Sequence, residues 1–310
     1  MSDIAAVNPL WQVPMPPLAS SYYLERIRDA FPDIMWTNYR RVQTIADPDH
    51  VMILLDNGIA FRFENDEDTN LTRERIVLDA LRSSLKAIPI PDYAFVPKAS
   101  DFAGYHTIPG TRLSPWRFWR LSKANRNEAA QRLGTFISGL HSYPVAKARS
   151  LGVEEGDASV RRRRMWKELF AERADELQHE VRNVFEAWIE RSDSIDHSYE
   201  PVLAHNDLWY KHIYHDPSTG RLTGIIDWGD VEITDPAKDF YGFWVYGESF
   251  LDEVLSHYEY CDANLKDRSF EHFWGIAISS WFSRPPGGRF FRRSTWQGRP
   301  TSEWPMGQVR

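Results

Sequence analysis

The sequence is poor in the features that mark secreted, membrane-spanning and repetitive proteins. One cysteine, Cys261, stands in 310 residues, so no disulfide can form within the chain, and a reducing compartment, the cytoplasm, is expected. No stretch reaches the ~20 consecutive apolar residues that a membrane-spanning helix needs. The N-terminal residues include Asp3 and lack the apolar run of a secretory signal. We therefore expect a cytoplasmic protein that has no membrane partner.

The net charge indicates which ligands suit the chain. The formal charge is −7, which argues against nucleic acid as a partner, because nucleic-acid binding depends on neutralising phosphates. The same charge is compatible with a cationic small-molecule ligand, although plain solubility is the favoured explanation of the overall charge. The 13 tryptophans are numerous and can serve either the core or a ligand surface.

The N-terminal third of the sequence predicts an extended arm followed by a β-rich region. Residues 1–20 contain four prolines, which favour an extended arm. A helix is expected over residues 22–30. Apolar or alternating runs at 41–45, 51–55 and 59–63, with the turn signal Asp56-Asn-Gly58, predict an antiparallel meander.

The rest of the sequence is mainly helical in pattern. We expect helices over residues 70–85, 125–142 and 159–189, and from 236 onward. Short strands are expected at 93–96, 102–107, 201–204, 213–214 and 222–226. The chain is thus expected to be an α+β protein of two lobes, with an N-lobe over residues 21–107 and a C-lobe over residues 108–310. Ligands usually bind in the cleft between such lobes.

Two aspartates at the ends of apolar runs carry the chemistry. Asp207 follows the run at 201–204, and Asp227 follows the run at 222–226, with His212 between them. One carboxylate placed in this way can orient a hydroxyl nucleophile, while the other can hold Mg²⁺ on phosphates. A metal-dependent hydrolase is an alternative interpretation, because His205, His215 and Asp216 are further possible ligands nearby.

A buried ion pair is expected in the N-lobe. Glu74 lies on the same helical stripe as Leu78, Leu81 and Leu85, and a carboxylate on an apolar stripe needs a partner. Arg62, midway along the last strand of the meander, is the candidate, although a partly exposed Glu74 without this partner is equally compatible with the pattern.

Three segments together resemble the aminoglycoside phosphotransferase family. They are His205-Asn-Asp-Leu-Trp-Tyr-Lys-His212, Gly224-Ile-Ile-Asp-Trp-Gly-Asp230 and Asp235-Pro-Ala-Lys-Asp-Phe240. The His-Asn-Asp…His form and the segment at 102–110 are most similar to the aminoglycoside 2''-phosphotransferases. The resemblance implies a protein-kinase-like fold and a kinase that transfers the γ-phosphate of ATP or GTP to a hydroxyl of a small molecule, with Mg²⁺ as cofactor.

Carried over by position, the resemblance also implies roles for single residues. Asp207 becomes the catalytic carboxylate, and His212 and Asp227 become the metal ligands. Asp239 would brace the catalytic loop. Arg62 would be the strand cation that holds the phosphates of the nucleotide, and Glu74 would be its partner on the helix. The connector between the lobes, whose backbone would meet the purine, comprises Tyr105, His106, Thr107 and Ile108.

Three positions depart from the family pattern. His212 stands where a metal-binding asparagine is usual, a variant that resembles one branch of the family. Arg62 stands where a lysine is expected, and the phosphate-covering turn at 46–49 has two acids and no glycine. The last two departures favour a second alternative, a degenerate kinase that binds nucleotide or ligand without turnover. The resemblance implies an aminoglycoside-like acceptor. Carboxylates and aromatic faces would suit such a polycationic sugar, although they suit helix packing equally well. Candidate acceptor contacts are Glu232, Tyr241, Trp244 and Glu248, with Trp274 and Trp281 further along.

Overall fold

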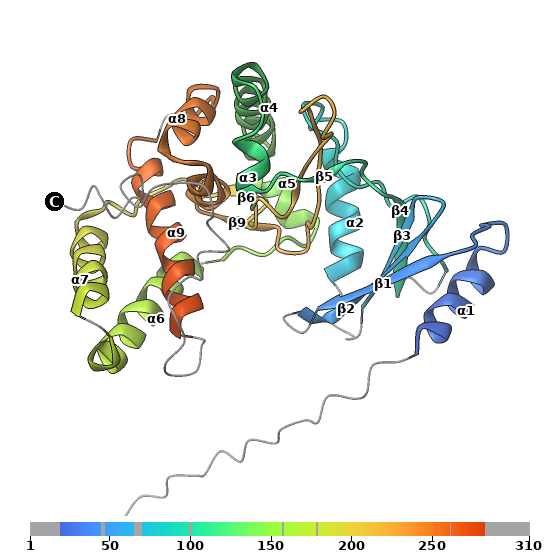
Figure 1. The fold of residues 1–310 in the computed structure, drawn as a ribbon, viewed down its shortest axis with the longest axis horizontal. Helices are drawn as coiled ribbons and strands as arrows, with labels where there is room; N and C mark the ends of the chain where they lie inside the picture. Colours follow the sequence, from blue (N-terminus) through green and yellow to red (C-terminus); the bar gives the residue numbers. More distant parts are fainter. Residues whose placement is uncertain are drawn as a thin grey trace, which may run out of the picture. The chain divides into compact units, whose positions relative to one another are not determined.

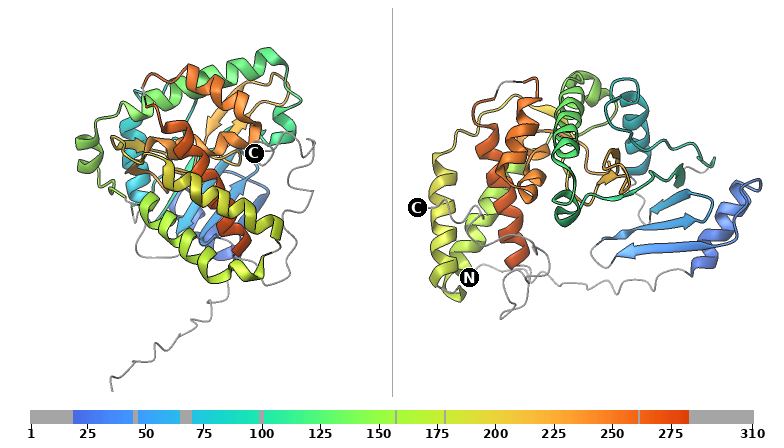
Figure 2. Two further views of the ribbon diagram at one scale, coloured as in Figure 1. Left: turned by 90° about the vertical axis from the view of Figure 1, so that its left-hand side faces the viewer. Right: turned by 45° about the horizontal axis from the view of Figure 1, so that its top comes forward.

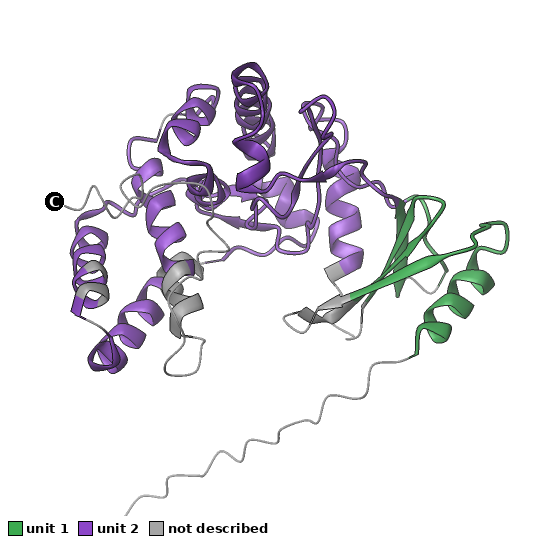
Figure 3. Ribbon diagram, viewed as in Figure 1, with its two compact units in different colours: residues 1–67, 94–105 green, residues 68–93, 106–310 purple. Residues whose placement is uncertain are grey.

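The computed structural model describes residues 19–44, 47–64, 70–98, 101–156, 158–177, 179–260 and 262–282. The expected N-terminal arm, Cys261 and the side chain of Trp281 lie outside these residues, and the turn at 46–49 does so in part. Contacts divide the chain into two compact units. The first comprises residues 1–67 and 94–105, and the second comprises residues 68–93 and 106–310 (Figure 3).

The first unit is a four-stranded sheet with one helix. Its strands follow the order β1-β2-β3-β4, and the first two pairings are antiparallel. The hairpin between β2 and β3 turns at Gly58, whose φ of 82° lies in the left-handed region that glycine tolerates. The meander is therefore confirmed. The elements are α1 (Ser20–Ala30), β1 (Tyr39–Thr44), β2 (Asp47–Leu55), β3 (Ile59–Glu64) and β4 (Phe102–His106).

The core of this unit is aromatic. Phe63 and Phe102 stack with ring centroids 4.5 Å apart, and Ile27 of α1 is fully buried in the same cluster. Burying each such side chain contributes about 1.5–3 kcal/mol. The strand expected at residues 93–96 does not form. Its place is taken by a single bridge between Phe95 and Gly104, where a Cβ on Gly104 would collide with the Phe61 ring.

The second unit holds most of the helices around one large core (Figures 1 and 2). The helix expected to begin at residue 125 begins two residues earlier, because the Ser122 hydroxyl accepts the N–H of Asn125 and caps it. The helices are α2 (Asn70–Leu81), α3 (Pro115–Phe118), α4 (Lys123–His141), α5 (Val145–Ser150), α6 (Ala158–Arg173), α7 (His179–Ser194), α8 (Glu248–Ser256) and α9 (Leu265–Phe282).

The segment expected to be helical over residues 159–189 is interrupted by η1 (Ala174–Glu176) between α6 and α7. Figures 1 and 2 show α6, α7 and α9 side by side. A buried carboxylate fastens them: Glu271 of α9 accepts from the Ser192 hydroxyl of α7 and lies 3.2 Å from the Arg163 guanidinium of α6. Arg163 therefore serves the packing of these helices, whereas its neighbour Arg164 is exposed.

Two small sheets present the motif residues. One has the order β5-β7-β8, and the other pairs β6 with β9 in antiparallel register, with Leu203 opposite Ile233. The strands are β5 (Thr111–Arg112), β6 (Val202–Ala204), β7 (Ile213–His215), β8 (Leu222–Ile225) and β9 (Glu232–Thr234). The short helices η2 (Pro236–Asp239) and η3 (Tyr241–Tyr246) follow β9.

Candidate active site

The loop after β6 carries Asp207, and a buried carboxylate from η2 holds that loop. Asp239, which has no exposed surface, accepts the backbone N–H of His205 at 2.9 Å and that of Asn206 at 2.8 Å. Asn206 has a φ of 67°, a left-handed conformation that asparagine tolerates better than most residues. The loop is therefore pinned immediately before Asp207, and the bracing role expected for Asp239 is confirmed.

Asp239 stays charged although it is completely enclosed. Burial opposes its charge, yet hydrogen bonding from His141, whose Nε2 lies 3.1 Å from Oδ2, and the His205 amide hold the pKa of Asp239 below its usual value. Nδ1 of His141 in turn lies 2.7 Å from the Tyr258 hydroxyl. This series of contacts connects α4 and the residues after α8 to the loop that carries Asp207.

The second aspartate also sits at a left-handed turn. Asp227 has a φ of 70° and follows β8, and the next residue, Trp228, is buried and donates its indole N–H to the Ile225 carbonyl over 3.2 Å. Nε2 of His205 lies 3.2 Å from the Ile226 carbonyl. Burial lowers the pKa of His205, so its imidazole remains neutral near neutral pH. His205 thus joins the two loops that carry the aspartates.

His212 brings the two aspartates together. Its Nδ1 lies 2.8 Å from the Asp207 carbonyl oxygen and 3.4 Å from Asp207 Oδ2, and its Nε2 lies 3.1 Å from Asp227 Oδ2. A carbonyl can only accept, so Nδ1 carries a proton. In the neutral ring Nε2 then presents its lone pair to the side occupied by the Asp227 carboxylate. Two electron-rich atoms so close together suit a shared cation.

The donor set fits magnesium bound with phosphates better than a metal bound by protein alone. Mg²⁺ typically takes one or two carboxylates and completes its shell with phosphate oxygens and water. Within the described parts of the chain, no group of three or more His, Cys, Asp or Glu side chains could hold a metal. His215 points instead to the Thr111 carbonyl at 2.9 Å, and Asp216 accepts from Ser218. The arrangement therefore gives no support to the metal-dependent hydrolase, which needs about three protein ligands.

The four expected acceptor contacts lie in different surroundings. The Tyr241 hydroxyl donates to Asp207 Oδ1 over 2.7 Å. Glu232 forms an ion pair with Lys238 at 3.3 Å, and Glu248 forms one with Lys266 at 2.9 Å. The other aromatic candidates are in the core: Trp244 is 8% exposed and bonded to Ser269, and Trp274 is 6% exposed. Contact of any of these residues with an acceptor stays a prediction.

The expected nucleotide-binding residues are divided between the two units. Arg62 is buried on β3 in the first unit, and Glu74 is buried on α2 in the second, where it accepts the Tyr93 hydroxyl at 3.0 Å. Their pairing would join the two units and stays a prediction. The boundary between the units falls between Tyr105 and His106, and these two residues, with Thr107 and Ile108, form the expected connector.

Sequence reasoning missed two contributors to this site. His141 lies 98 residues before Asp239, the carboxylate through which it helps to fix the loop, and no local pattern indicates that contact. The side chain of Asn206 donates to the Asp230 carbonyl at 2.9 Å and so ties the two aspartate loops together. Its place inside the His-Asn-Asp motif was the available signal.

Known proteins resemble this chain in sequence and in fold. The sequence profile described as the phosphotransferase enzyme family matches residues 46–270. The uncharacterized protein YcbJ of Bacillus subtilis (strain 168) is 25% identical over 213 residues, which cover 64% of this chain and 66% of that protein. This chain thus spans just under two thirds of the length of that relative.

Solved structures share the fold. The GDP complex of a mutant aminoglycoside 2'-phosphotransferase-IIIa matches with a TM-score of 0.75 at 23% identity, over 86% of this chain and 90% of that one. The GDP and kanamycin complex of APH(2″)-IIIa matches with a TM-score of 0.71 at 25% identity, over 83% and 90%. Macrolide 2'-phosphotransferase MphH from Brachybacterium faecium matches with a TM-score of 0.61 at 18% identity, over 84% and 90%.

Proposed function

The chain belongs to the phosphotransferase enzyme family, and we propose that it transfers the γ-phosphate of GTP or ATP to a hydroxyl group of an aminoglycoside-like small molecule. The family resemblance and the kinase-like α+β fold expected from the sequence are confirmed. The observation that carries the proposal is the continuous set of contacts from Asp207 through His212 to Asp227, with distances of 2.8 and 3.1 Å.

Asp207 is the group that acts on the acceptor. Its side chain is 35% exposed, so an acceptor hydroxyl can reach the carboxylate. The carboxylate accepts the hydrogen bond of that hydroxyl and aims its oxygen at the γ-phosphorus. It takes the proton as the new oxygen–phosphorus bond forms and the bond between the γ-phosphorus and the β–γ bridging oxygen breaks, which releases the nucleoside diphosphate. His212 and Asp227 would hold Mg²⁺, which neutralises phosphate charge when it is bound.

The acceptor class rests on charge and on the relatives. The matched structures are aminoglycoside and macrolide phosphotransferases, and one of them holds kanamycin together with GDP. An acidic chain suits a polycationic aminoglycoside better than a polyanionic acceptor. Arg62, Glu74 and the connector at residues 105–108 are proposed to bind the nucleotide.

Transfer of labelled phosphate tests the proposal directly. The protein is incubated with Mg²⁺ and γ-labelled GTP or ATP, against a panel of aminoglycosides, macrolides and uncharged sugars. Asp207→Asn should lower kcat roughly 10²–10⁴-fold, as expected for removal of a positioned base. The matched control is Asp216→Asn, an aspartate in the exposed turn between β7 and β8, which should leave kcat unchanged.

Two results would overturn the proposal. One is the absence of phosphoryl transfer to every acceptor, and the other is an Asp207→Asn enzyme that keeps more than about a tenth of wild-type kcat. Tight nucleotide binding without turnover would instead support the degenerate kinase. The observation in favour of that second candidate is Arg62, which stands where the resemblance expects a lysine.

A further inference from the structure

Tyr241, which lies outside both aspartate loops, contacts the proposed catalytic carboxylate. It opens η3, and its hydroxyl donates to Oδ1 of Asp207 over 2.7 Å. Tyr241 is 5% exposed, whereas the Asp207 side chain is 35% exposed. We infer that Tyr241 is a positioning residue, whose hydroxyl fixes the Asp207 carboxylate so that Oδ2 alone is offered to the acceptor. This inference rests on the function proposed above.

The hydrogen-bond inventory of Asp207 leads to this assignment. A carboxylate turns easily about its last side-chain bond, so an aspartate in an exposed loop can offer either oxygen. A hydrogen bond from a hydroxyl to a charged carboxylate is among the stronger kinds, and here it occupies Oδ1. Oδ2 lies 3.4 Å from Nδ1 of His212, but that nitrogen donates its hydrogen bond to the Asp207 carbonyl oxygen, which lies 2.8 Å away. Oδ2 therefore keeps its capacity to accept.

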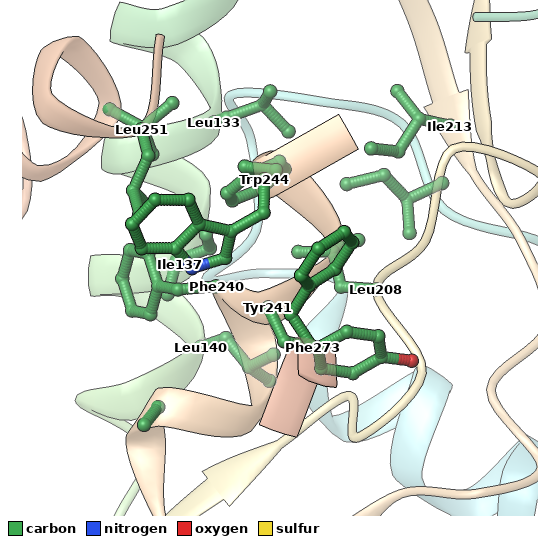
Figure 4. Packing of buried hydrophobic residues seen from close by; sticks show 14 of the residues in the cluster. Leu133, Ile137, Leu140, Leu208, Ile213, Phe240, Tyr241, Trp244, Leu251 and Phe273 are labelled. Carbon is green, nitrogen blue, oxygen red and sulfur yellow. The ribbon is translucent and has the colours of Figure 1, made fainter. Parts of the chain in front are cut away.

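The backbone that carries Tyr241 lies directly against the catalytic loop. A Cβ on the next residue, Gly242, would lie 2.1 Å from the carbonyl oxygen of Leu208, so only glycine allows this approach. The Tyr241 ring packs near the Trp209 ring, with centroids 5.7 Å apart. Figure 4 shows Tyr241 among the buried residues of the core, with its hydroxyl oxygen pointing out of the cluster. The Tyr241 hydroxyl is therefore held in position by closely packed neighbours.

A purely structural tyrosine would give the same picture, so the test must separate packing from positioning. Tyr241→Phe keeps the ring and its packing and removes only the hydroxyl. The chain offers a matched control in the same short helix: Tyr246 is fully buried, and its hydroxyl donates to the Leu113 carbonyl at 2.6 Å. Tyr246→Phe loses a comparable hydrogen bond that has no contact with Asp207.

The measured quantities are kcat, the KM of acceptor and nucleotide, and the midpoint of thermal unfolding. Tyr241→Phe should lower kcat at least about tenfold and leave both KM values within about threefold, because misplacement of a reacting group slows chemistry more than binding. Tyr246→Phe should keep kcat within about twofold while its thermal midpoint falls. Equal kcat for wild type and Tyr241→Phe, or equal loss in both variants, would overturn the inference.

A double variant shows whether the Tyr241 hydroxyl acts through Asp207. In Asp207→Asn, adding Tyr241→Phe should change kcat by less than about twofold, because residues in one hydrogen-bonded unit are not additive. A full and independent loss in the double variant would overturn the inference. Nucleotide hydrolysis with water as acceptor is measured in parallel. If wild type transfers phosphate neither to an acceptor nor to water, the proposed function fails. If wild type is active and Tyr241→Phe matches it, only the role of Tyr241 fails.

Discussion

Replacing Asp239 by asparagine tests how the loop that carries Asp207 is held. The carboxylate accepts from the amides of His205 and Asn206 at 2.9 and 2.8 Å and lies 3.1 Å from Nε2 of His141. Asparagine offers one acceptor oxygen, so its NH₂ group must face at least one N–H in a site closed to water. A hydrogen bond to a charged group contributes about 1.5–3 kcal/mol, and a buried donor left unpaired costs about 1–3 kcal/mol. Asp239→Asn should therefore lower the free energy of unfolding by about 2–4 kcal/mol.

Urea denaturation of wild type and variant, followed by tryptophan fluorescence, measures this change. Asp216→Asn is the control, because Asp216 also accepts a backbone amide, from Ser218 at 2.8 Å, but in an exposed turn where water can replace the bond. Its urea midpoint should hardly move. Asp239→Asn should also lower kcat, since the loop that it releases begins two residues before Asp207. An Asp239→Asn enzyme with wild-type stability and turnover would show that the amide contacts are not what holds the loop.

Three further predictions concern the metal, the strand arginine and pH. Asp227→Ala should abolish the Mg²⁺ dependence of nucleotide affinity in calorimetry, and unchanged Mg²⁺-linked affinity would refute its metal role. Arg62→Lys should leave kcat unchanged or lower it, whereas a gain of about tenfold, ~1.4 kcal/mol of transition-state stabilisation, would mark a decayed kinase. Burial opposes the charge of Asp235, but bonds from His272 and Arg268 hold its pKa below the ordinary value. This stabilisation is complete above about pH 4 and is lost as the pH falls through the lower pKa of the folded state. When both proteins are unfolded in urea at pH 6 and at pH 3, the free energy of unfolding should thus fall less between the two pH values in Asp235→Asn than in wild type.

Local patterns predicted the elements whose determinants are close in sequence. The meander follows from alternating apolar residues and from a turn with glycine at position 58, and the strands before Asp207 and Asp227 follow from short apolar runs. The family resemblance, based on the three motif segments, is confirmed by the match over residues 46–270. These features depend on neighbours within a few residues, which is why the sequence indicates them.

Local sequence patterns do not predict contacts between segments that are far apart in the chain. The three-residue strand β9 forms because it pairs with β6, about thirty residues earlier, and its own sequence Glu-Ile-Thr is too short to indicate a strand. Tyr241 was predicted as an acceptor contact, and its bond to Asp207 spans 34 residues. One contact of Glu74 shows the same limit, because Tyr93 supplies a hydroxyl that no helical stripe predicts.

The loops that carry Asp207 and Asp227 each contain one residue with a strained backbone, and buried side chains hold that backbone in place. Asn206 and Asp227 have φ values of 67° and 70°, and a non-glycine residue in such a region costs of order 1–3 kcal/mol. Such a conformation persists only where its surroundings determine it. The Asp239 carboxylate accepts the backbone N–H of Asn206, and Nε2 of His205 lies 3.2 Å from the carbonyl oxygen of Ile226, the residue before Asp227. Without these fully enclosed groups, we expect both turns to relax. These buried contacts therefore help to keep Asp207 and Asp227 within reach of one imidazole ring, that of His212.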